Sequence, residues 1–229
     1  MKLFFLVFSL SLSTLIFCQN NEYNRVSFEI NAGIMKPIYP LTRDFKSPIY
    51  KNINFDIGSR FMLNDLAGIK AVFNVSQFKF ESDLFSLNDS NFYSKSYYYR
   101  TTLEGIVNLG KMIHLQKYSP KLGLLLHGGS GFSILQSKKT LKNINWKNDF
   151  SDIMINVTAG ATTQYKINEY LVANLDLNFI AHLFQTFAFD MNTSGKRQGF
   201  DGMLFNISTG LTWYLGEKDE HFDWKNESK

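Results

Sequence analysis

The stretch YYYRTTLEGIVNLG, residues 97–110, alternates between two kinds of side chain. Leu103 and Val107 fall in one string of alternate residues, and Arg100, Thr102 and Glu104 fall in the other. Successive side chains of a β-strand point to opposite faces, so this period of two predicts a strand with one apolar and one polar face. A soluble protein turns the apolar face inward, whereas a membrane barrel turns it toward lipid and keeps the polar face inside.

The same alternation recurs along the chain and predicts eight strands. The segments are 26–34, 53–60, 69–76, 99–109, 122–133, 153–162, 171–179 and 205–215. Long and short connections alternate between them, which is typical of an up-and-down barrel with short periplasmic turns and long outer loops. We therefore expect an all-β protein, an eight-stranded antiparallel up-and-down transmembrane β-barrel.

The polar strings decide which face is inside. They collect glycines and the charged residues Glu29, Asp56, Arg60, Lys70, Arg100, Glu104 and Asp176. A lysine or arginine on the lipid face costs roughly 2–4 kcal/mol at mid-membrane, a cost that charges in the lumen avoid. Glycines there would leave room for long charged neighbours, since an eight-stranded lumen is just wide enough to be filled by side chains. We expect a lumen that is polar from end to end.

Aromatic residues gather near the predicted strand ends. Such positions fit the aromatic girdles of a membrane barrel, and an aromatic-rich soluble core is the alternative. The residues are Tyr97, Tyr98, Tyr99, Tyr165, Tyr170, Trp213 and Tyr214.

The first eighteen residues are of a different kind. Lys2 precedes the apolar run 3–17, after which CQNN turns polar, and this order is typical of a secretory signal peptide. We place cleavage near Cys18 and Gln19; acylation of Cys18 as a lipoprotein is the alternative, which Phe17 before it disfavours. Cleavage there would remove the only cysteine and leave no disulfide. The expected domains are a signal peptide (1–18), an outer-membrane barrel (19–216) and a periplasmic tail or truncated linker (217–229).

Candidate chemistry is sparse. His127, His182, Asp176 and Ser133 share the inward parity and could suggest a hydrolase, but no nucleophile elbow accompanies them. Polar filling of the lumen explains them better. His114 and His221 fall in connections. We expect no catalytic residue, no cofactor and no metal site.

The net charge of the chain does not by itself identify a partner. The formal net charge is +4, and no basic stripe with interleaved aromatics appears. One predicted outer loop is basic; a solvated loop is the favoured interpretation, and docking of anionic lipopolysaccharide is the alternative. Its lysines are Lys138, Lys139, Lys142 and Lys147.

Three segments carry a resemblance to a known family. YYYRTTLEGIVNLG, KLGLLLHGGSGFSIL and GFDGMLFNISTGLTWYLGEKDEHFDW, in that order, resemble the membrane barrel of OmpA-family outer-membrane proteins. The resemblance implies an eight-stranded barrel with inward arginines and glutamates that bridge each other. The matching candidates for a lumen charge network are Glu29, Arg60, Arg100 and Glu104.

In many members of that family, the segment corresponding to GEKDEHFDW leads to a peptidoglycan-binding domain. The thirteen residues 217–229 are too few to bury a core, because domains below about 40 residues usually need extra cross-links. We expect them to form a mobile tail and do not expect peptidoglycan binding.

The sequence thus predicts a monomeric integral protein of the cell outer membrane with a structural or surface-interaction role and at most a small pore. Its expected partners are outer-membrane lipids and lipopolysaccharide, with no nucleic acid. Two alternatives remain open. One is an outer-membrane enzyme that modifies lipid, which would need an apolar acyl slot or a catalytic cluster. The other is a soluble lipocalin-like carrier.

Overall fold

The computed structural model describes residues 23–39, 52–82, 92–141, 147–187, 189, 202–218 and 220–224. The expected cleavage position near Cys18 and Gln19 lies outside these residues, as does Lys142 of the basic loop.

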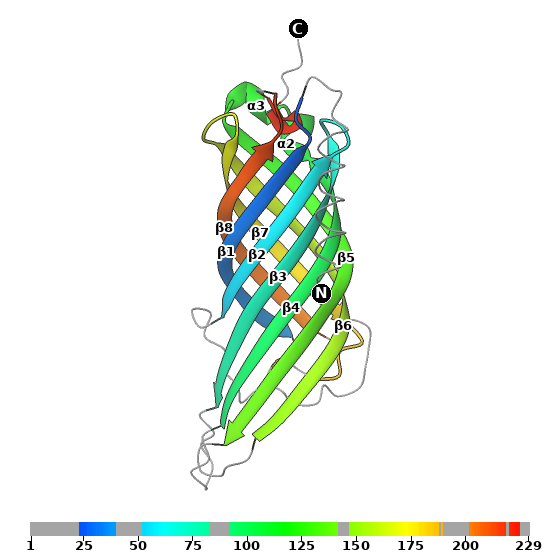
Figure 1. Cartoon of the computed structure of the whole chain (residues 1–229), viewed down its shortest axis with the longest axis vertical. Coiled ribbons are helices and arrows are strands. Elements are labelled where there is room, and N and C mark those ends of the chain that lie inside the picture. The colour runs from blue at the N-terminus through cyan, green and yellow to red at the C-terminus, as the bar shows by residue number, and fades with distance from the viewer. Residues whose placement is uncertain are drawn as a thin grey trace.

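Within the described part of the chain, eight strands pair in sequence order and β1 closes on β8, so the sheet is a barrel (Figure 1). Every pairing is antiparallel. The prediction of an eight-stranded antiparallel up-and-down barrel is confirmed. The strands are β1 (Val26–Tyr39), β2 (Ile53–Met62), β3 (Ala67–Ser82), β4 (Phe92–Asn108), β5 (Leu122–Leu141), β6 (Lys147–Lys166), β7 (Leu171–Leu183) and β8 (Gly202–Leu215).

Tight connections gather at one end of the barrel, which we call the short-turn end. Asn64 builds the β2–β3 turn, because its Oδ1 accepts the backbone N–H groups of Leu66 and Ala67 at 2.9 and 2.7 Å. Asn168 repeats this arrangement between β6 and β7. An asparagine that bonds its own following backbone favours such turns.

The third connection at this end carries two short helices, α2 (Leu109–Met112) and α3 (Leu115–Tyr118). None of the helices in the described residues is long and apolar enough to cross a membrane.

The opposite end, which we call the long-loop end, is uneven. Strands β3 to β6 have 16 to 20 residues, whereas the other four have 10 to 14. Figure 1 shows β3, β4, β5 and β6 continuing past the ends of the others. These four strands therefore form a sheet, here called the wing, that extends the barrel wall on one side.

Burial along the strands is inverted relative to a soluble protein. Leu103, Phe132 and Ile153 are 63 to 68% exposed, whereas Arg60 and Arg100 are 1% exposed. Apolar side chains thus face outward and charged side chains face the lumen, as expected for the alternation in residues 97–110 of a membrane barrel. An apolar exterior excludes the soluble carrier, whose outer surface would be polar.

Two glycines show different reasons for their place on the inward strings. A Cβ on Gly160 would lie 2.6 Å from Cε1 of His127 and 2.6 Å from the backbone oxygen of Leu177, so this glycine makes room for a long lumen side chain, as predicted, and also for the neighbouring strand. A Cβ on Gly131 would lie 1.9 Å from the backbone oxygen of Thr101. There the glycine permits a close approach of two strands instead.

The aromatic girdle is only partly as predicted. Trp213, Tyr165 and Tyr170 are 36 to 50% exposed on the outside, near the short-turn end. Tyr98 and Tyr214 are at most 3% exposed, so the girdle assignment is wrong for these two. Their parity places them in the lumen, where each hydroxyl group has a polar partner.

Candidate functional site: the filled lumen

Glu29 lies at the centre of one ion-pair group in the lumen. Its Oε2 lies 2.6 Å from Nζ of Lys70 on β3, and its Oε1 lies 3.6 Å from Nε of Arg60 on β2. All three side chains are at most 7% exposed. Burial of a charge is costly unless the charge is paired, so these contacts are what allow the residues to fill the lumen.

His127 joins a second group. Its Nδ1 lies 2.9 Å from Glu104 Oε2, and its Nε2 lies 3.0 Å from Asp176 Oδ1. The hydroxyl of Thr162 also donates to Asp176 Oδ1, at 2.6 Å. One imidazole thus spans the lumen between carboxylates on β4 and β7.

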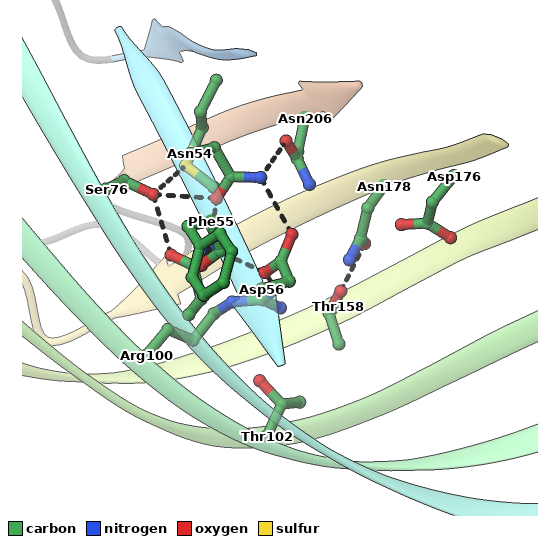
Figure 2. A network of polar contacts seen from close by, with 12 residues as sticks. Asn54, Phe55, Asp56, Ser76, Arg100, Thr102, Thr158, Asp176, Asn178 and Asn206 are labelled. Carbon is green, nitrogen blue, oxygen red and sulfur yellow. Dashed lines mark hydrogen bonds and ion pairs between the residues drawn. The ribbon is translucent and has the colours of Figure 1, made fainter. Parts of the chain in front are cut away.

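Arg100 contacts two carboxylates more loosely, Asp56 at 3.8 Å and Glu104 at 4.0 Å. Asp56 receives closer hydrogen bonds from the amides of Asn54 and Asn74, at 2.9 and 2.7 Å. Figure 2 shows the Asn54 amide directed at the Asp56 carboxylate, with Arg100 beside it. A layer of asparagine side chains therefore continues the charged groups toward the long-loop end.

Beyond this layer an apolar cluster interrupts the polar lumen, so the prediction of a lumen polar from end to end is wrong. Eight buried residues form one cluster there, each at most 1% exposed. The hydroxyl of Tyr98 contacts His182 Nε2 at 2.7 Å and Ser133 Oγ at 2.9 Å and thereby joins the cluster to the polar layer. The cluster consists of Met35, Phe78, Tyr98, Leu135, Met154, Ile180, Phe189 and Leu204.

At the short-turn end, the segment 220–224 folds back onto the barrel. The backbone N–H of Asn24 donates to Glu220 O at 2.9 Å, and that of Phe222 donates to Asn24 O at 3.1 Å. Phe222, Asp223 and Trp224 form a 3₁₀ turn and are buried. The expectation of a mobile tail is wrong for these residues, which we call the C-terminal plug (220–224).

The carboxylate of Asp223 anchors this plug. Its Oδ2 accepts hydrogen bonds from Arg60 Nη2 at 2.7 Å and from the Tyr214 hydroxyl at 2.9 Å. Trp224 Nε1 donates to the same hydroxyl at 2.8 Å, and the ring of His221 stacks on Tyr214 with centroids 4.0 Å apart. The plug and the charged lumen are therefore one connected polar structure.

Burial by itself would raise the pKa of Asp223, but the Arg60 guanidinium outweighs it and holds that pKa below its ordinary value. The pKa of His221 is also lowered, chiefly because burial disfavours the imidazolium. Its Nδ1 accepts the backbone N–H of Asp223 at 3.2 Å, which fits a neutral ring.

The four residues assigned to a charge network all lie in the lumen, Glu29 with Arg60 and Arg100 with Glu104. Their closest partners are others: Lys70 for Glu29, His127 for Glu104 and Asp223 for Arg60. Lys70 stands on the inward polar string and His127 shares the inward parity, so the sequence carried a signal for both. Asp223 lies outside every strand, so strand periodicity does not predict that its side chain enters the lumen.

Two possible sites of chemistry are not assembled. Ser133 contacts Tyr98 and accepts from Asn156, and no described contact joins it to His127, so the imagined hydrolase arrangement is not formed. Among the described residues, no group of three or more histidine, cysteine or carboxylate side chains could hold a metal ion.

A closed antiparallel barrel with an apolar exterior and a charged interior defines the class of transmembrane β-barrels. Known structures share this fold. A major outer-membrane protein from Thermus thermophilus superposes with a TM-score of 0.53 at 10% identity, over 83% of this chain and 99% of that one.

Two further structures are similar at lower scores. The attachment invasion locus protein Ail of Yersinia pestis, solved with a heparin analogue, gives a TM-score of 0.47 at 13% identity, over 84% of this chain and 97% of that one. The outer-membrane protease OmpT of Escherichia coli gives 0.46 at 7% identity, over 84% and 94%. No family model and no curated protein matches the sequence. The chain thus has the fold of outer-membrane β-barrels.

Proposed function

We propose that this chain is an integral protein of the outer membrane with a structural and surface-interaction role and at most a small pore. The inverted burial carries the proposal, since Leu103, Phe132 and Ile153 stand outward while Arg60 and Arg100 are buried inside. Such a surface is stable against lipid, where every backbone group must also be satisfied within the protein, as a closed barrel ensures. The short-turn end then faces the periplasm and the wing faces outward.

The filled lumen favours a structural role over transport. The apolar cluster around Phe78 and Phe189 spans the lumen near the outer end, and the C-terminal plug occupies the inner end. A lipid-modifying enzyme would need an acyl slot, and the apolar part of the lumen holds this chain's own side chains instead. Lipopolysaccharide as a partner and a monomeric state belong to the same proposal.

Fractionation tests the proposal directly. The protein should remain with outer membranes through carbonate extraction, and unboiled samples should migrate differently from boiled ones on a detergent gel. Recovery as a soluble periplasmic protein would refute it.

Conductance separates a filled barrel from a wide pore. In planar bilayers the protein should show small or no unitary currents. Large steady currents would contradict the filled lumen.

A further inference from the structure

Three lysines stand side by side on the outer face of the wing. Lys79 of β3 is the direct cross-strand partner of Lys95 on β4, and Lys95 is the partner of Lys138 on β5. Their neighbours Phe78, Ser96 and Ser137 are buried inside, so alternation directs the lysines outward. The register therefore concentrates positive charge on this part of the outer face. Asp149 of β6 faces Lys138 and ends the row.

The row lies just beyond the apolar band. Outward residues of β5 are apolar or small from Leu124 to Ile134, a height of about 26 Å for strands tilted as in membrane barrels. That matches the apolar band of about 25 Å in such proteins. Lys138 follows about 10 Å further, a height at which lipid headgroups lie.

A row of hydrogen-bonding side chains separates the lysines from the apolar band. Gln77 pairs across the strands with Tyr97, and Tyr97 pairs with Gln136. Nζ of Lys95 lies 4.8 Å from the centre of the Tyr97 ring, so this ammonium group is held over the phenol. From the membrane outward, the surface thus presents apolar, then amide and phenol, then cationic side chains.

We propose that the lysine row (Lys79, Lys95 and Lys138) binds the phosphate groups of an anionic lipid in the leaflet on the long-loop side. The proposal rests on the membrane insertion proposed above. Neighbouring strands lie about 4.8 Å apart, so the three ammonium groups spread over about 10 Å and suit a headgroup with more than one phosphate. Only a lipid places acyl chains on the apolar band and phosphate at the height of the row. Gln77 and Gln136 would bind the polar part between them.

The test uses the purified barrel in a non-ionic detergent and native mass spectrometry. The probe is a bis-phosphorylated, acylated disaccharide, compared with the same molecule without phosphates and with inorganic pyrophosphate. The variant replaces Lys79, Lys95 and Lys138 by glutamine. Its matched control replaces three exposed lysines near the short-turn end, Lys117→Gln, Lys121→Gln and Lys218→Gln, and thus removes the same charge.

The row variant should lose more than about tenfold in affinity for the phosphorylated lipid, since each lysine near an anionic surface contributes about fivefold. The control should keep the affinity of the unmodified protein, and the dephosphorylated lipid should bind all three proteins equally weakly. Equal losses in both variants, or no loss in the row variant, would overturn the proposal. Competition by pyrophosphate at the concentrations of the lipid would also overturn it, because the site would then bind a free anion.

The shift in gel mobility on heating separates this test from that of the proposed function. If the proteins do not show this mobility shift, the proposal of membrane insertion itself is refuted. If all three show it, the lipid affinities alone decide for or against the lysine row.

Discussion

Asp223 Oδ2 lies 2.7 Å from Arg60 Nη2, and both side chains are fully buried. The two residues are 163 positions apart in the chain. Their contact joins the C-terminal plug to the wall of the barrel on β2 and continues through Glu29 to Lys70. The segment after the last strand is therefore part of the folded lumen.

Removal of the Asp223 carboxylate should destabilise the barrel. Asp223→Asn leaves buried Arg60 with Glu29, at 3.6 Å, as its one carboxylate partner among the described contacts. Breaking a buried ion pair costs about 3–5 kcal/mol, less where water can enter. We expect a lower free energy of unfolding in a urea titration in detergent, together with faster proteolysis after Gly216.

The matched control is Glu217→Gln, which removes an exposed carboxylate from the segment that leads to the plug. It should change neither measurement, because surface charges contribute little. Equal stability of the Asp223→Asn variant and the control would show that the plug is not anchored through this ion pair.

Charge on the outer face should be far less tolerable than added bulk. Leu103 is 63% exposed on β4, and an arginine there costs roughly 2–4 kcal/mol if the position lies near the membrane midplane. In lipid vesicles, the Leu103→Arg variant should therefore unfold at a lower urea concentration than the unmodified protein. Leu103→Phe is the control and should be close to neutral. If Leu103→Arg kept the stability of the unmodified protein while Leu103→Phe lowered it, this face would not contact lipid.

The strands and their facing could be predicted because a period of two is a local property of the sequence. Arg100 and Glu104 mark the inward face of β4 without knowledge of any other strand. Such parity says which side a residue faces but not which residues lie at the same height. The pairing of Glu104 with His127 depends on the register of β4 with β5, which the sequence does not state.

The local sequence pattern predicts neither the docking of the plug nor the apolar cluster. The side chains that donate hydrogen bonds to the Asp223 carboxylate, Arg60 and Tyr214, belong to β2 and β8, so no local pattern predicts these contacts. Met154 stands on the inward string of the segment 153–162, and an inward apolar residue is a signal for the cluster, whereas Leu204 precedes the predicted segment 205–215. Polar and charged residues dominate the inward strings, and Phe189 lies outside every strand, so parity alone does not predict an apolar cluster.

Coupling in the charged lumen should follow the distances. Glu104 lies 2.9 Å from His127 but 4.0 Å from Arg100. In double-mutant cycles with alanine, the Glu104–His127 coupling energy should exceed the Arg100–Glu104 coupling energy, and both should differ from zero. Residues that share a network couple by about 0.5–3 kcal/mol. Urea unfolding of the single and double variants gives both values. Simple additivity of the Glu104 and His127 substitutions would contradict the bridge.

Docking of the plug should weaken in mild acid. The pKa of His221 is lowered by burial, with Arg60 also disfavouring its charge, although Asp223 at 3.5 Å opposes the shift. A plug that docks with neutral His221 binds fewer protons than a released one whose histidine has an ordinary pKa near 6.5. Its stability is therefore complete above about pH 6.5 and falls below it, by up to about 1.4 kcal/mol per pH unit. Asp223, with its lowered pKa, stays charged in this range and adds no dependence.

Trp224 reports this change, because its ring is 4% exposed when the plug is docked. In a background with Trp146→Phe and Trp213→Phe, quenching of Trp224 fluorescence by acrylamide should rise between pH 7.5 and pH 5.5. His221→Phe keeps an aromatic ring over Tyr214 but cannot take up a proton, so its quenching should not change with pH. His114→Gln, which replaces an exposed histidine, should behave as the background does. A rise that persists in His221→Phe would assign the pH dependence to another group, and no rise in the background would mean that the docked plug tolerates a charged His221.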